Sequence, residues 1–148
     1  YLACNINGPA AVSGGLVLFE AGLIPDAVVS VTAVSSRRSS SLDTPYGSIH
    51  WQRLPAYLVF RGTYRVTDPP GYITAVREKA LLDLLYTTRY TPPNYSLWKD
   101  FFFEDLRIDE DEAAGLDFVL LEELAIIFGS PKITKHVQWF RKYFGARD

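Results

Sequence analysis

The chain has 148 residues, of which 48% are hydrophobic and 14% aromatic, so it has the length of one domain and enough apolar side chains for a packed core. Its formal net charge of −2 excludes a general electrostatic attraction to nucleic acid or to an anionic membrane. The single cysteine, Cys4, excludes an internal disulfide, and no apolar run reaches the roughly 18 residues that a membrane-spanning helix needs.

Short strands are predicted for most of the first half. Ser13 is placed to cap a helix over residues 14–21, which would end at Gly22. Between two of the strands lies the segment "SSRRSSSLDTPYG", which we expect to form a hairpin-like connection that displays Arg37 and Arg38. β-branched or alternating patterns predict strands over residues 28–34, 48–54, 57–60, 63–66 and 72–75.

Helical patterns replace the strands from residue 76 onward. The best marked helix has Ser130 as its N-cap, Pro131 in its first turn and Gly145 after its end. Asp109 and Glu112 have the spacing of a capping box. Helices are predicted over residues 76–87, 97–106, 110–114, 118–128 and 131–144.

The order of these elements predicts an α+β fold, with a short antiparallel or mixed sheet in the first half and a helical second half. We expect one domain over residues 1–148, with a strand-rich part and its packing helix in residues 1–88 and a helical part in residues 89–148.

Charges are distributed unevenly along the chain. Residues 104–123 contain nine acids and one base, whereas residues 132–148 contain five bases and one acid. The nearly neutral total therefore conceals local acidic and basic patches.

Patterns for catalysis or for a metal are weak. The two histidines, His50 and His136, have no second metal ligand at a usual spacing, and no nucleophile elbow or phosphate-binding loop is present. The acids Asp105, Asp109 and Asp111 do not match a calcium loop. We therefore expect no catalytic residue, no metal and no cofactor, with a metal-dependent nuclease built on the acids of residues 104–117 as the alternative.

Cations among the predicted strands are the strongest candidates for a binding surface. Arg37, Arg38, Arg53 and Lys79 are expected to lie on one basic face of the sheet. Trp51 shares a strand face with Arg53, and arginine beside aromatic rings suits phosphate and base contacts. The same residues also suit an acidic protein surface, and a solvated connection that binds nothing is the alternative. Further cations that would extend this face are Arg61, Arg65 and Arg77.

Three stretches, in this order, resemble the AbiEi family of antitoxins. They are "VSGGLVLFEAGLIPDAVVSVTAVSSRR", "RRSSSLDTPYGSIHWQRLP" and "GYITAVREKALLDLLY", which together cover residues 12–88. The first departs from the family at Gly14-Gly15-Leu16, where a larger residue and an Ala-Leu pair are usual, and the second has fewer arginines.

The resemblance implies a bacterial type IV toxin–antitoxin system that acts in abortive infection against phage. A full-length family member has an N-terminal winged helix that binds operator DNA and represses its own promoter. Its C-terminal domain neutralises a nucleotidyltransferase toxin without a tight, stable complex. This chain would be that cytoplasmic C-terminal domain, without the winged helix and with no membrane partner.

The third stretch also has a structural interpretation. Lys79 and Asp83 stand four residues apart on a helix, where they can pair for a few tenths of a kcal/mol. We therefore do not expect Glu78, Lys79 or Asp83 to be catalytic. A bare protein–protein module, whose acidic helices contact a basic partner, is the remaining alternative.

Overall fold

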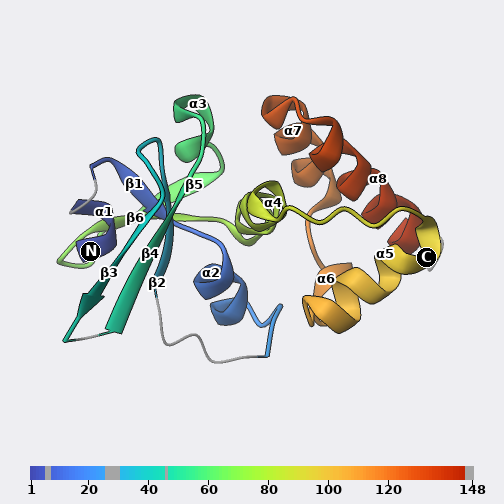
Figure 1. Ribbon diagram of the computed structural model, residues 1–148, viewed down its shortest axis with the longest axis horizontal. Helices are drawn as coiled ribbons and strands as arrows, with labels where there is room; N and C mark the ends of the chain where they lie inside the picture. Colours follow the sequence, from blue (N-terminus) through green and yellow to red (C-terminus); the bar gives the residue numbers. More distant parts are fainter. Residues whose placement is uncertain (6–7, 26–30, 46, 146–148) are drawn as a thin grey trace.

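The computed structural model describes residues 1–5, 8–25, 31–45 and 47–145. A mixed six-stranded sheet forms in the first half and helices fill the second, which confirms the predicted α+β class. Figure 1 shows the sheet on one side, helices α5 to α8 on the other, and helix α4 between them.

The sheet has the strand order β3-β4-β2-β1-β6-β5. Strands β2 and β4 are parallel, as are β1 and β6, while the other three neighbouring pairs are antiparallel. The strands are β1 (Ala10–Val12), β2 (Val31–Ser35), β3 (Ser40–Thr44), β4 (Gly47–Arg53), β5 (Thr63–Val66) and β6 (Tyr72–Ala75). Four of the five predicted strands are found, although residues 28–30 of the first lie outside the described residues.

The strand predicted over residues 57–60 is wrong, because this segment forms helix α3 (Ala56–Val59). Leu58 and Val59 are neighbours and both are buried, whereas a half-buried strand would turn one of them outward. Conversely, the serine-rich residues of β3 form a strand that was not predicted. An edge strand is held by backbone pairing with β4 and needs no apolar face, so its sequence carries little signal.

The predicted helices of the second half are confirmed. They are α4 (Arg77–Thr87), α5 (Tyr95–Asp100), α6 (Glu110–Ala114), α7 (Phe118–Phe128) and α8 (Pro131–Gly145), with a π-helical turn, η1 (Phe101–Asp105), continuing α5. Side-chain caps fix the starts of α6 and α7: Asp109 Oδ1 accepts from the N–H of Glu112 (3.0 Å), and Asp117 Oδ1 accepts from that of Leu120 (3.0 Å). Gly129 ends α7 in the left-handed conformation, with φ of 63°.

Helix α2 (Gly15–Glu20) begins one residue later than predicted, and Ser13 does not cap it. Gly14 occupies the N-cap with φ of 74°, and the Ser13 hydroxyl instead donates to Asp83. The helix ends at Glu20, one residue earlier than predicted, and Gly22 follows it with φ of 80°, as expected for a residue that terminates a helix.

The two faces of the sheet are covered differently. Helices α2 and α4 pack on one face, and a single apolar cluster continues from there into the helical half, from Val12 through Leu81 to Phe140. Helix α1 (Leu2–Asn5) covers the other face over a small cluster that includes Ile49 and Trp51. Helix α4 is therefore enclosed by both halves of the molecule.

Candidate functional site

Three of the four predicted binding residues lie at one end of the sheet. Strands β2 and β4 are parallel and in register, so Ser35 at the end of β2 lies beside Arg53 at the end of β4. The chain then passes the end of β4 to reach β3 on its far side, and Arg37 and Arg38 stand on this crossover. We call Arg37, Arg38 and Arg53 the arginine group.

Serine side chains hold the backbone of the crossover. The Arg37 N–H donates to Ser35 Oγ (3.1 Å), and the Arg53 N–H donates to Ser39 Oγ (3.0 Å). Gly8 lies against the Arg37 side chain so closely that a Cβ on it would come within 2.5 Å of Arg37 Nε. The serines around the arginines thus have a structural use, since they satisfy backbone donors in a tight connection.

All three side chains of the arginine group are exposed. Within the described parts of the chain, no carboxylate forms an ion pair with them. The acid on the neighbouring strand, Asp43, accepts from the Ser48 hydroxyl (2.7 Å) instead. Exposed guanidinium groups can each offer two parallel donors to a phosphate or carboxylate, so this end of the sheet suits an anionic partner.

Other predicted members of the basic face lie elsewhere. Arg65 stands on β5, at the opposite edge of the sheet, next to the exposed Tyr64. Arg77 pairs with Glu78 (3.2 Å) and donates to the carbonyl of Gly115 (2.6 Å). The aromatic partner expected for Arg53 is also missing, because Trp51 is buried and its Nε1 donates to the carbonyl of Ala3 (2.7 Å).

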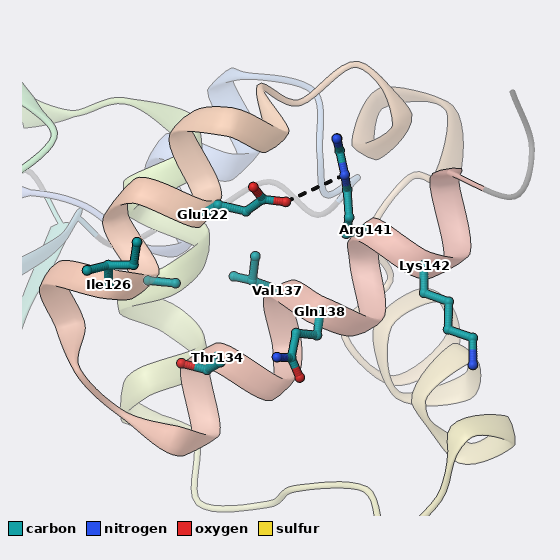
Figure 2. A pocket seen from close by; sticks show the side chains of 8 residues that line it. Glu122, Ile126, Thr134, Val137, Gln138, Arg141 and Lys142 are labelled. Atoms are coloured by element: carbon teal, nitrogen blue, oxygen red, sulfur yellow. Dashed lines mark ion pairs between the residues drawn. The ribbon is translucent and has the colours of Figure 1, made fainter.

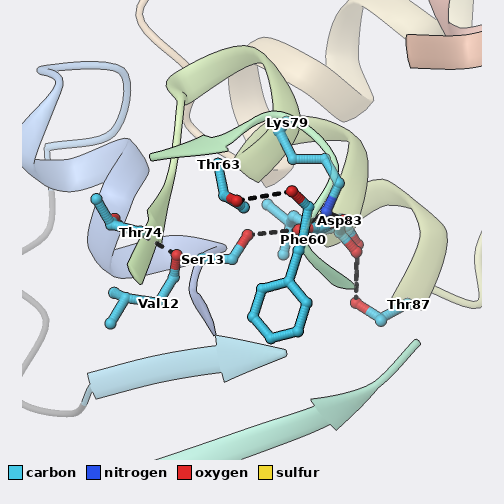
Figure 3. Close-up of polar contacts among 9 residues, drawn as sticks. Val12, Ser13, Phe60, Thr63, Thr74, Lys79, Asp83 and Thr87 are labelled. Atoms are coloured by element: carbon cyan, nitrogen blue, oxygen red, sulfur yellow. Dashed lines mark hydrogen bonds and ion pairs between the residues drawn. The ribbon is translucent and has the colours of Figure 1, made fainter. Parts of the chain in front are cut away.

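Lys79 is not on the basic face, and its assignment to a binding surface is wrong. Its side chain is fully buried, and Nζ donates to both carboxylate oxygens of Asp83 (2.7 and 2.8 Å). Ser13 Oγ donates to the same carboxylate (2.6 Å), as Figure 3 shows. The predicted pairing of residues 79 and 83 is correct, but it forms in the interior instead of on a helix surface.

In the Lys79–Asp83–Ser13 network, burial and ion pairing shift the pKa values of the charged groups in opposite directions. Desolvation lowers the pKa of Lys79 and raises the pKa of Asp83, while their mutual attraction and hydrogen bonds act in the opposite direction on each group. The ammonium also lies 5.7 Å from the centroid of the Phe128 ring. The network links the segment after β1 to helix α4, next to α7, so its role is to hold distant parts of the fold together.

The sequence pattern predicted the pair of Lys79 and Asp83 but assigned Ser13 to a helix cap, so it missed the bond from Ser13 to this pair. The available signal was that two of the stretches that resemble the antitoxin family contain its members. Ser13 lies in the first stretch, and Lys79 and Asp83 lie in the third. The residues that carry the resemblance therefore include a buried polar contact between distant parts of the chain.

The acidic stretch takes part in helix capping and tertiary contacts. Asp109 and Asp117 cap α6 and α7, Glu110 accepts from the Tyr143 hydroxyl, and the Asp117 N–H donates to Glu78 Oε2 (3.0 Å). Among residues 1–5, 8–25, 31–45 and 47–145, no three His, Cys, Asp or Glu side chains converge as a metal site.

The two histidines differ in environment. His50 is exposed on β4, whereas His136 is buried among aromatic rings, with Trp98 at a centroid distance of 4.8 Å. Its Nδ1–H donates to the carbonyl of Lys132 (2.9 Å), which leaves Nε2 as an acceptor without a hydrogen bond from any described residue. Burial, and then the charge of Lys132, lower the pKa of His136 to about 4, so the ring is neutral at pH 7.

No family model, curated protein or solved structure matches this chain. Among the described residues, none of the helices combines the length and the hydrophobicity needed to cross a bilayer.

Proposed function

We propose that this chain is a non-enzymatic, AbiEi-like antitoxin domain whose arginine group contacts a nucleic acid. The observation that carries the proposal is the gathering of Arg37, Arg38 and Arg53, exposed and without a carboxylate partner among the described residues, at one end of the sheet. The resemblance of residues 12–88 supplies the biological class. The proposed setting is the bacterial cytoplasm, which suits a chain with one cysteine.

The mechanism is electrostatic. Guanidinium groups bind phosphate oxygens and position a nucleic acid without reading its sequence. In a full-length protein the bound strand would be operator DNA beside a winged helix, which would assist autoregulation of the promoter. Alternatively, the arginine group would compete with the nucleotidyltransferase toxin for the toxin's own nucleic-acid substrate, which requires no stable complex between the two proteins.

A growth assay tests the antitoxin role. The chain is expressed together with the nucleotidyltransferase that we expect in the neighbouring reading frame, and growth should be restored. The variant Arg37→Ala/Arg38→Ala should restore growth less well, because it removes two of the three cations. The matched control, Arg61→Ala/Arg65→Ala, removes two exposed arginines elsewhere and should rescue like the parent chain.

Two results of this assay have different meanings. Absence of rescue by the parent chain, or of a nucleotidyltransferase gene beside it, contradicts the antitoxin assignment. Full rescue by Arg37→Ala/Arg38→Ala contradicts only the role of the arginine group.

A further inference from the structure

A groove of about 430 Å³ lies between helices α7 and α8, in the half of the molecule that the proposed function does not use. Figure 2 shows its lining. Ala125 and Val137 are its buried apolar residues, while Ile126 and Glu122 lie on the α7 side and Gln138 and Arg141 on the α8 side.

The α7 side exposes more aliphatic surface than its role in this fold requires. Ile126 is 80% exposed and Val119 is 60% exposed, the two highest values among the large hydrophobic residues described. They are seven residues apart and so lie on the same side of the helix. The apolar residues that face the core, such as Leu121 and Leu124, are already buried without them.

The α8 side is basic. Arg141 and Lys142 of α8 line the groove, and residues 131–145 contain no acid. Arg141 reaches toward Glu122 at a distance of 3.5 Å, and both side chains remain about half exposed. Among the described residues that line the groove, Glu122 is the acid on the α7 side, and the two cations lie on the α8 side.

We propose that this groove binds an amphipathic helix of a protein partner. The apolar stripe of the partner helix would lie on Ile126 and on the floor of the groove, and the carboxylates of the partner helix would face α8. A groove between two helices fits a third helix that inserts anchors at positions i, i+3 or i+4, and i+7. Glu122 at the α7 edge of the groove would repel a phosphate backbone, while its exposed aliphatic surface suits an apolar stripe, so a protein helix fits better than a nucleic acid. This proposal does not depend on the antitoxin assignment, because it uses none of the arginine group.

The test uses the full chain and a designed helical peptide of about 18 residues, with leucines at the anchor spacing and glutamates on one flank. A second peptide has lysine in place of every glutamate. In a titration followed by ¹⁵N–¹H correlation spectra, the glutamate peptide should bind saturably and shift the amide signals of α7 and α8. The lysine peptide should bind more weakly.

Variants of the chain identify the groove. Ile126→Glu should weaken the glutamate peptide at least about tenfold by losing apolar contact and adding repulsion. Tyr64→Glu, which changes a 54% exposed aromatic residue on β5, should leave binding unchanged. Lys142→Glu should weaken the glutamate peptide and strengthen the lysine peptide, and it keeps the test decisive if Ile126→Glu fails to fold.

Several outcomes would overturn the proposal. The first is the absence of saturable binding, and the second is equal affinity for both peptides. The third is that Lys142→Glu, and Ile126→Glu if it folds, bind the glutamate peptide as tightly as the parent chain. Self-association of the parent chain that Ile126→Glu abolishes would assign the groove to a second copy. Displacement of the peptide by duplex DNA would assign it to nucleic acid, and either result rejects the partner helix.

Discussion

The arginine group and the Lys79–Asp83–Ser13 network both use cations from the stretches that resemble AbiEi antitoxins, yet their environments are opposite. Arg37, Arg38 and Arg53 are solvated at the end of the sheet, where an anion can reach them. Lys79 is enclosed by helix α4 and its neighbours and has its counterion inside the protein. An exposed cation is available to bind a partner, whereas a buried cation must keep its counterion for the fold to be stable.

The largest predicted effect on stability comes from the buried Lys79–Asp83 pair. Asp83→Leu leaves the Lys79 ammonium without a counterion and should lower the free energy of unfolding by about 3–5 kcal/mol. Urea denaturation followed by circular dichroism measures this. The double variant Lys79→Met/Asp83→Leu removes both charges and should recover most of the loss. A single variant as stable as the parent would show that the network does not hold the fold.

His136 provides a second buried position, in the helical half. Its pKa is lowered to about 4 from 6.5, so the neutral ring is favoured in the folded state. Its contribution is fully present above pH 6.5 and is lost as the pH falls toward 4. Since one pKa unit corresponds to about 1.4 kcal/mol, the loss should approach about 3 kcal/mol.

The measurement for this prediction is the free energy of unfolding at several pH values, compared between the parent chain and His136→Phe. The phenylalanine variant keeps an aromatic ring next to Trp98 but cannot bind a proton, so its stability should fall less between pH 6.5 and 4. Parallel pH profiles for the two proteins would mean that the buried ring is not the titrating group.

The smallest effect on stability is expected for the exposed cations. Arg37→Ala/Arg38→Ala should change the free energy of unfolding by less than about 0.5 kcal/mol, because both side chains are exposed. Its affinity for a mixed-sequence DNA duplex should fall, and the slope of log K against log salt should become shallower by about two units. Fluorescence anisotropy at several salt concentrations measures the slope, with Arg61→Ala/Arg65→Ala as control. An unchanged slope would remove the pair from any DNA interface.

Local signals determined much of the secondary structure. Helices α6 and α7 have the predicted bounds because Asp109, Asp117 and Gly129 act within one turn of the helix ends they fix. The failures concern segments whose state depends on distant partners. Residues 57–60 are too few for periodicity to separate a strand from a helix, and β3 is a strand only because β4 lies beside it.

The candidate sites divide in the same way. The sequence determined that Arg37 and Arg38 would be exposed, because a short polar connection between strands has no core to enter. Only the tertiary structure brought Arg53 to the same end and buried Lys79, since α4 lies between the sheet and the helical half and is covered on nearly all sides. The groove beside Ile126 was likewise decided by how α8 packs on α7, because which residues of an apolar helix remain exposed depends on what covers them.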